Sequence, residues 1–223
     1  MSNYIQRRIN LIEKLKLLGI KDDRVLLAMN SVPRHLFVED ALRSRAYDNV
    51  TLPIGLGQTI SQPYIVAKMS ELLIENVSDI KKLKKVLEIG TGCGYQTAIL
   101  EKIGIPSVYS IERINHFREL AKVNLRNCGF IKSRLKCSDG YLGLPQEAPF
   151  SAIIVTAAPK NMPSNLLDQL SIGGRMVLPL ENEDKQYLWL IEKLPNGFIK
   201  KTCITEVRFV PCLLYTSPSP RDA

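Results

Sequence analysis

The chain has 223 residues, of which 45% are hydrophobic and 23% are charged, a composition typical of a globular protein with a full core. It contains no apolar run of roughly 18 residues, the length that a membrane span needs. Its first residues lead into charged ones rather than into a signal segment. We therefore expect a cytoplasmic protein that has no membrane partner.

The net charge of +8 leaves binding to nucleic acid open. The basic residues are spread along the chain, however, and their densest run, residues 81–85, directly precedes an apolar segment. A solvated connector is the simpler explanation of that run, so we expect no nucleic-acid partner.

The cysteines are odd in number and scattered, with no C-x-x-C pair, and only two histidines accompany them. This pattern supports neither a disulfide framework nor a zinc site, so we expect no metal. Reduced cysteines that serve in packing are the better interpretation: Cys93, Cys128, Cys137, Cys203 and Cys212.

The N-terminal third of the chain is predicted to be helical. Apolar residues three or four apart predict a helix over residues 4–18, which Gly19 ends. Asp22 or Asp23 can cap a second helix that ends near residue 30. Residues 34–59 are interpreted as an irregular but ordered loop, because proline and glycine punctuate them.

A third helix is expected to begin at Pro63, which suits the first turn of a helix, and to run to about residue 76. Ser61 is a plausible cap for this helix.

From residue 86 onward, short β-rich segments alternate with helical patterns. This alternation predicts parallel strands joined by right-handed crossovers, hence an α/β fold with a doubly wound sheet. Two last strands follow one another through a Pro-Asn-Gly turn and should pair antiparallel at the sheet edge, which makes seven strands. The predicted strands cover residues 86–89, 108–112, 134–138, 152–156, 175–180, 186–194 and 202–210, and the helices between them cover 95–103, 114–128 and 163–170.

We divide the chain into a helical cap with an active-site loop at residues 1–80 and a main α/β domain at residues 81–211. Residues 212–223 do not continue the pattern before them and resemble the in-frame translation of a sequencing-library adapter. We expect this tail to be non-native and the natural chain to continue past Pro211. A genuine flexible tail is the alternative.

The glycine-rich segment after the first predicted strand is the most informative motif. An apolar strand leads directly into G-x-G-x-G at Gly90, Gly92 and Gly94, and a helical pattern follows. Glycines let the backbone turn sharply and let a ligand lie against it at a helix N-terminus. Glu112 ends the next predicted strand, where a carboxylate can hold ribose hydroxyls. The segment therefore predicts a nucleotide-cofactor site.

A dinucleotide fingerprint would need glycine where this chain has Tyr95 or Thr97, which disfavours NAD. The form E-x-G-x-G-x-G, beginning at Glu88, instead resembles motif I of the S-adenosylmethionine-dependent methyltransferases. An acid inside an apolar strand is costly unless it is paired. The resemblance implies S-adenosylmethionine as cofactor, with Glu88 positioning it directly or through the loop. The further contacts implied are Gly90, Thr91, Gly92, Gly94 and Glu112, with Asp139 and Gly140 at the adenine edge.

A second resemblance is sharper and covers nearly the whole chain. Residues 52–67, LPIGLGQTISQPYIVA, resemble the hallmark of the protein-L-isoaspartate O-methyltransferases, as do residues 32–38, 153–159 and 207–211. This resemblance implies methylation of the α-carboxylate of L-isoaspartyl residues in damaged proteins and peptides, which starts repair through a succinimide. It also implies that cofactor contacts follow residue 211, where this chain carries the suspected tail.

The same resemblance assigns roles to individual residues. Ser61 matches the designated active-site residue, and Thr59 and Ile60 lie beside the cofactor. The substrate side is implied to be formed by Val155, Thr156, Ala157 and Ala158. An isoaspartyl carboxylate has a pKa of roughly 3.3–3.7 and is already an anion at neutral pH, so no general base is expected.

Two other classes of function stay open. The basic pI allows another S-adenosylmethionine-dependent methyltransferase, acting on nucleic acid or a small molecule. Base-amino methylases commonly carry an N/D/S-P-P-Y/F box after the fourth strand, whereas residues 156–159 read TAAP, with neither aromatic nor carboxamide. A non-catalytic binding module on the same fold is the second alternative. We expect a monomer.

Overall fold

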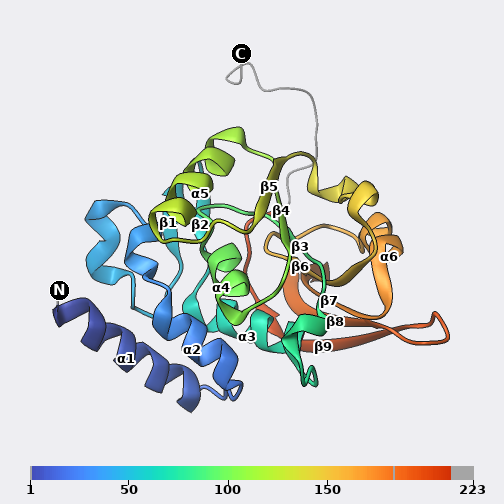
Figure 1. The fold of residues 1–223 in the computed structure, drawn as a ribbon, viewed down its shortest axis with the longest axis horizontal. Coiled ribbons are helices and arrows are strands. Elements are labelled where there is room, and N and C mark those ends of the chain that lie inside the picture. The colour runs from blue at the N-terminus through green and yellow to red at the C-terminus, as the bar shows by residue number, and fades with distance from the viewer. Residues whose placement is uncertain (1, 183, 212–223) are drawn as a thin grey trace.

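The computed structural model of the chain describes residues 2–182 and 184–211 (Figure 1). The expected adapter-derived tail, residues 212–223, lies outside the described residues. The division into segments 1–80 and 81–211 stays a prediction. Buried residues from both segments share one hydrophobic cluster, so the two segments pack against each other.

A seven-stranded sheet forms the centre of the molecule, and its strand order is β5-β4-β3-β6-β7-β8-β9. The strands from β5 to β7 pair in parallel, whereas β7, β8 and β9 pair antiparallel. The predicted doubly wound, mostly parallel sheet with an antiparallel edge is therefore confirmed. The strands are β3 (Val86–Ile89), β4 (Val108–Glu112), β5 (Arg134–Cys137), β6 (Phe150–Val155), β7 (Leu170–Asn182), β8 (Lys185–Lys193) and β9 (Ile199–Val207).

Helices cover both faces of this sheet (Figure 1). Side chains alternate along β3, so Val86 joins the cluster beneath the N-terminal helices while Leu87 and Ile89 join the cluster beneath α6. No helix of the described residues is long and apolar enough to cross a membrane. The helices are α1 (Ser2–Leu17), α2 (Asp23–Ser31), α3 (Pro63–Ile74), α4 (Tyr95–Ile103), α5 (Asn115–Asn127) and α6 (Ser164–Gln169).

The caps of two helices test the local predictions. Asp22 caps α2 as expected, because its side chain accepts a hydrogen bond from the amide of Arg24 at 2.9 Å. Pro63 occupies the first turn of α3, also as expected. The expectation that Ser61 caps this helix is wrong, since Gln62 stands at the cap and makes no capping hydrogen bond through its side chain.

Residues 34–59 are more regular than the sequence suggested. They contain two 3-10 helices, η1 (Arg34–Phe37) and η2 (Asp40–Arg45), and most of a short hairpin of β1 (Leu52–Gly55) and β2 (Gln58–Ile60). Leu56 adopts a φ of 48° in the turn of this hairpin, beside glycines that favour the same region. The interpretation as an irregular loop is therefore wrong, because strands of four and three residues carry too little alternation to recognise.

The segment at the β5 edge of the sheet carries an excess of positive charge. Residues 113–136 contain seven Lys and Arg residues against one Glu, and they form α5 and β5. Strand β5 ends the sheet, and its Arg134 and Lys136 are exposed. Basic side chains on an edge strand disfavour pairing with a strand of another molecule, which accounts for these two charges.

Glu88 is a fully buried carboxyl in the central strand β3. Its Oε2 accepts a hydrogen bond from Oγ1 of Thr97 in α4, while Oε1 has no partner among the described residues. Burial raises the pKa of Glu88 to about 7, against the opposing effect of the Thr97 and Ser110 hydroxyls. Glu88 therefore holds a proton for much of the time near neutral pH, which lowers the cost of its burial.

The substitution Glu88→Gln should remove a pH dependence of stability. Above its ordinary pKa of 4.5 the unfolded carboxyl is ionised, whereas the folded one keeps its proton up to about pH 7. The wild type therefore loses stability as pH rises through this window, by up to about 3 kcal/mol relative to Glu88→Gln. Urea unfolding at several pH values between 4.5 and 8 measures this difference. Glu39→Gln, at an exposed position, is the control, and a pH-independent gap between wild type and Glu88→Gln would contradict the raised pKa.

Candidate functional site

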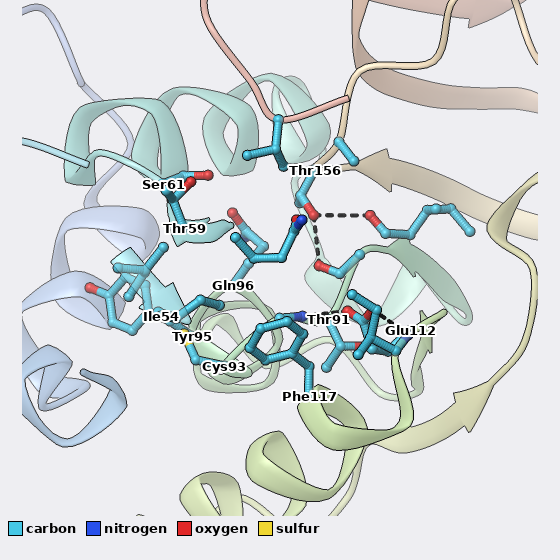
Figure 2. A pocket seen from close by; sticks show the side chains of 18 of the residues that line it. Ile54, Thr59, Ser61, Thr91, Cys93, Tyr95, Gln96, Glu112, Phe117 and Thr156 are labelled. Atoms are coloured by element: carbon cyan, nitrogen blue, oxygen red, sulfur yellow. Dashed lines mark hydrogen bonds between the residues drawn. The ribbon is translucent and has the colours of Figure 1, made fainter. Parts of the chain in front are cut away.

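A cavity of about 990 Å³, counting its opening to solvent, lies at the carboxyl ends of β3 and β4 (Figure 2). Strand β3 has β4 on one side and β6 on the other, so the strand order reverses at this point. Open α/β sheets bind ligands at such a reversal, outside the carboxyl ends of the strands. The cavity is therefore the candidate functional site.

The glycine loop between β3 and α4 forms the floor of the cavity. Gly90 has a φ of +94°, and a Cβ at this position would lie 2.5 Å from Oγ1 of Thr156. Gly94 has a φ of +89°, and a Cβ there would lie 3.2 Å from side-chain atoms of Ala121 and Leu125 in α5. Both positions accept glycine alone without rearrangement, so the loop can pack closely against Thr156 and against α5.

Hydrogen bonds fix the loop to the neighbouring strands. The hydroxyl of Thr156, which follows β6, lies 2.6 Å from the carbonyl oxygen of Gly90 and 2.9 Å from that of Ile89 (Figure 2). The hydroxyl of Thr91 lies 2.6 Å from that of Ser110 in β4. The ends of three strands are thus held together around the loop.

Glu112 ends β4 and lines the cavity. Its two carboxylate oxygens accept hydrogen bonds from the amides of Gly92, at 2.8 Å, and Ile114, at 2.9 Å. Each oxygen keeps a second acceptor position. Glu112 therefore stabilises two loops and can still accept a hydrogen bond from a ligand hydroxyl.

The segment from Thr59 to Ser61 forms a wall opposite Glu112 (Figure 2). Asn49 fixes the chain just after it, since its carbonyl accepts from Nε2 of Gln62 at 2.8 Å and its side chain accepts from the amide of Tyr64 at 2.9 Å. Ser61 and Thr59 also line a second cavity, which extends toward Arg208 and Phe209. Ser61 is thus placed where two cavities adjoin.

The structure brings ten of the predicted site residues together around the main cavity. They are Thr59, Ile60, Ser61, Gly90, Thr91, Gly92, Glu112, Gly140, Thr156 and Ala157. Gly140 comes close because it has no side chain, since a Cβ there would lie 2.4 Å from Cγ2 of Ile89.

The other predicted site residues do not line this cavity. Glu88 lies beneath the loop, where it binds Thr97, and Gly94 faces α5. Asp139 instead caps the 3-10 helix η4 (Gly140–Leu142) by accepting from the amide of Tyr141. Two more residues support the loop that follows β6 instead of facing the cavity: Val155, which ends β6, and Ala158, whose amide donates to the carbonyl of Val210 at 2.9 Å.

Several cavity residues were missed from the sequence. Tyr95 and Gln96 directly follow the glycine loop, which is the one signal that could have found them. Phe117 lies in α5, against the cavity (Figure 2), and nothing in its local sequence marks it. The full set missed is Ile54, Gln58, Val66, Met69, Ile89, Cys93, Tyr95, Gln96, Ile111, Arg113, Ile114, Phe117, Val210 and Pro211.

The cavity lacks an activated nucleophile of the cysteine type. Cys93 lines it, but burial raises the pKa of its thiol to about 11, so the thiol is neutral at ordinary pH. Among the described residues, no group of three or more His, Cys, Asp and Glu side chains is arranged to hold a metal ion.

Known proteins resemble this chain over most of its length. A relative from Chromobacterium violaceum, named protein-L-isoaspartate O-methyltransferase, is 52% identical over 213 residues, which cover 96% of this chain and 92% of the relative. A protein of the same name from Nitrosomonas europaea is 50% identical over 209 residues, which cover 94% of this chain and 92% of the relative.

Solved structures agree with these relatives. One, also named protein-L-isoaspartate O-methyltransferase, has a TM-score of 0.80 at 28% identity and covers 92% of this chain, which spans 65% of that protein. Another, from Plasmodium falciparum, is described as an enzyme of this kind in complex with S-adenosyl-L-homocysteine. It has a TM-score of 0.79 at 26% identity, and the match covers 92% of this chain and 98% of that one. The sequence profile of the protein-L-isoaspartate(D-aspartate) O-methyltransferases matches residues 6–215. The chain therefore belongs to the protein-L-isoaspartate(D-aspartate) O-methyltransferase family.

Proposed function

We propose that the chain transfers a methyl group from S-adenosylmethionine to the α-carboxylate of L-isoaspartyl residues in damaged proteins and peptides. The product ester then closes to a succinimide, which starts the repair of the backbone. One observation carries this proposal: Ser61 stands across a single cavity from the glycine loop and Glu112. The names of the relatives and the S-adenosyl-L-homocysteine in the Plasmodium falciparum structure support it.

The residues around the cavity fit the cofactor. Gly92 presents bare backbone, and Glu112 can accept from ribose hydroxyls. Ile111, Ile114 and Phe117 add apolar surface of the kind that an adenine ring packs against. We propose that the cofactor is held by Thr59, Ile60, Gly90, Thr91, Gly92, Glu112 and Gly140, while Glu88, Gly94 and Asp139 shape the site without touching it.

When bound, S-adenosylmethionine supplies an electrophilic methyl group on a sulfonium sulfur. The isoaspartyl carboxylate is ionised at neutral pH, since its pKa is roughly 3.3–3.7, so the chain needs no general base. Among the described residues, Ser61 forms a hydrogen bond through its carbonyl, to Arg34, and none through its Oγ. It is therefore available to donate to the carboxylate and to fix its angle of approach, which is the alignment on which such a transfer depends.

The second cavity offers room for the polypeptide that carries the damaged residue. It adjoins the first at Thr59 and Ser61 and continues along Glu206, Arg208 and Phe209. We propose that Thr156 and Ala157 contact the substrate, while Val155 and Ala158 hold their loop in place. The substrates are damaged polypeptides of many sequences, since the damage arises wherever aspartyl and asparaginyl residues occur.

The proposal extends to three further points. The enzyme acts as a monomer, in the cytoplasm, and residues 212–223 are not native to it. Light scattering of the purified protein and fractionation of source cells test the first two. Sequencing of the locus from source DNA tests the third.

The first prediction from the proposed function concerns the substrate. Labelled methyl groups from S-adenosylmethionine should appear on a peptide that contains isoaspartate and not on its twin that contains aspartate. The assay uses the chain as printed and a second chain in which residues 212–223 are replaced by the C-terminus of the Chromobacterium violaceum relative. Transfer to the isoaspartyl peptide by either chain supports the function, whereas binding of S-adenosyl-L-homocysteine without transfer by both would reject the substrate assignment.

A second prediction concerns Ser61. The substitution Ser61→Ala should lower kcat for the isoaspartyl peptide by about tenfold to a hundredfold, because a hydrogen bond to a charged group contributes roughly 1.5–3 kcal/mol. The Kd for S-adenosyl-L-homocysteine, measured by calorimetry, should change by less than about threefold, since the loss falls on carboxylate alignment. Ser31→Ala, at the exposed end of α2, is the control. An unchanged kcat would remove Ser61 from the mechanism.

A third prediction concerns the glycine loop. Gly90→Ala should weaken binding of S-adenosyl-L-homocysteine by more than about tenfold, because its Cβ would displace Thr156 and the loop. Gly19→Ala is a matched control, since Gly19 has a nearly equal φ of +92° but nothing within 4 Å of the added Cβ. Both variants lose roughly 1–2 kcal/mol of stability to the positive φ. Equal cofactor affinity in the two variants would show that the approach of Gly90 to Thr156 is not needed for binding.

A further inference from the structure

Arg34 is a buried cation without a carboxylate partner. Its side chain is fully buried in η1, and no ion pair of the described residues includes it. Burial lowers the pKa of this guanidinium from its ordinary value. A buried charge without a counter-charge is costly, and an apolar side chain of similar size would stabilise the fold at least as well. The position of Arg34 therefore calls for an explanation beyond packing.

The contacts of Arg34 lead to the candidate active site. Its Nε donates to the carbonyl oxygen of Ala46 at 2.9 Å, and its Nη2 donates to the carbonyl oxygen of Ser61 at 2.9 Å. The guanidinium carbon lies 4.9 Å from the centre of the Tyr95 ring. Phe37 packs edge-on against the same ring, with 5.5 Å between the ring centroids.

These contacts join two walls of the cavity. Ser61 lies on one wall, and Tyr95 is the first residue of α4, directly after the glycine loop. The guanidinium is a rigid planar fork, so hydrogen bonds in two directions fix its plane and with it the carbonyl that it holds. The Ser61 carbonyl has no other donor among the described residues besides Arg34. Arg34 thus sets where the Ser61 backbone lies relative to the start of α4.

We propose that Arg34 is a positioning residue for Ser61: its guanidinium, held over the Tyr95 ring, fixes the Ser61 carbonyl and thereby aims the Ser61 hydroxyl at the substrate carboxylate. This inference rests on the proposed function. Lysine cannot replace arginine here, because one ammonium cannot reach the Ala46 and Ser61 carbonyls as a fork and also cover the ring.

The test is a double-mutant cycle on methylation of an isoaspartyl peptide, with the chain version that is active in the peptide assay. Arg34→Lys should lower kcat by at least about tenfold, because a small misplacement of the Ser61 hydroxyl that aligns the substrate slows the reaction by at least this factor. If Arg34 acts through Ser61, adding Arg34→Lys to Ser61→Ala should lower kcat by less than about twofold further. A merely structural role would instead make the two losses multiply, and that result would overturn the inference.

Arg24→Lys is the matched control. Arg24 also donates to two backbone carbonyls, those of Val77 and Ile74, but it pairs with Asp22 and does not line the cavity. The Arg24→Lys variant should have a lower melting temperature than the wild type, while its kcat stays within about twofold of the wild-type value. If the wild type does not methylate the isoaspartyl peptide either, the proposed function and this inference are rejected together. A wild type that is active, with kcat unchanged in Arg34→Lys, would reject the inference alone.

Discussion

The close approach of the Gly90 backbone to the Thr156 hydroxyl at the carboxyl end of β3 is the constraint on which the cavity depends. The chain leaves the strand at Gly90 with a positive φ and passes so near Thr156 that no side chain fits between them. The Thr156 hydroxyl then donates to the consecutive carbonyl oxygens of Ile89 and Gly90, where the turn begins. Because β3 lies at the reversal of strand order, this turn opens space above the sheet instead of filling it. Everything else that lines the cavity is placed relative to this turn.

The charges around the site suit a reaction in which the cofactor and the substrate themselves carry the reacting charges. Glu88 lies buried beneath the loop with a pKa of about 7, and the Cys93 thiol stays neutral. The carboxylate of Glu112 is already bound by two amides. The chain therefore contributes backbone groups and hydroxyls, whose orientation is fixed by the fold, and needs few mobile charges that would have to reorganise during the reaction. An arrangement of this kind favours alignment and exclusion of water over proton transfer.

The parallel core could be predicted because its strands are buried on both faces and are bounded by glycine or polar residues. Strands 86–89 and 108–112 were predicted with the bounds that the structure has. The hairpin at residues 52–60 could not be predicted, because Pro53 and two glycines break so short a pattern. The motifs singled out the glycine loop and Ser61, both of which line the cavity, whereas Phe117 and Arg34 come near it only through the packing of α5 and η1, which local sequence does not encode.

The N-terminal extension is tied to the main sheet by more than apolar packing. Arg34 holds the Ser61 carbonyl, and the Tyr95 hydroxyl at the start of α4 donates to the sulfur of Met29 in α2 at 3.6 Å. Residues of both segments share one hydrophobic cluster, so neither can complete that cluster alone. The boundary predicted at residue 80 is thus not a boundary of the cavity, whose walls come from both sides of it. The segment before residue 81 thus supplies the wall from Thr59 to Ser61 and the buried Arg34 behind it, and its packing on the main sheet places that wall relative to the glycine loop.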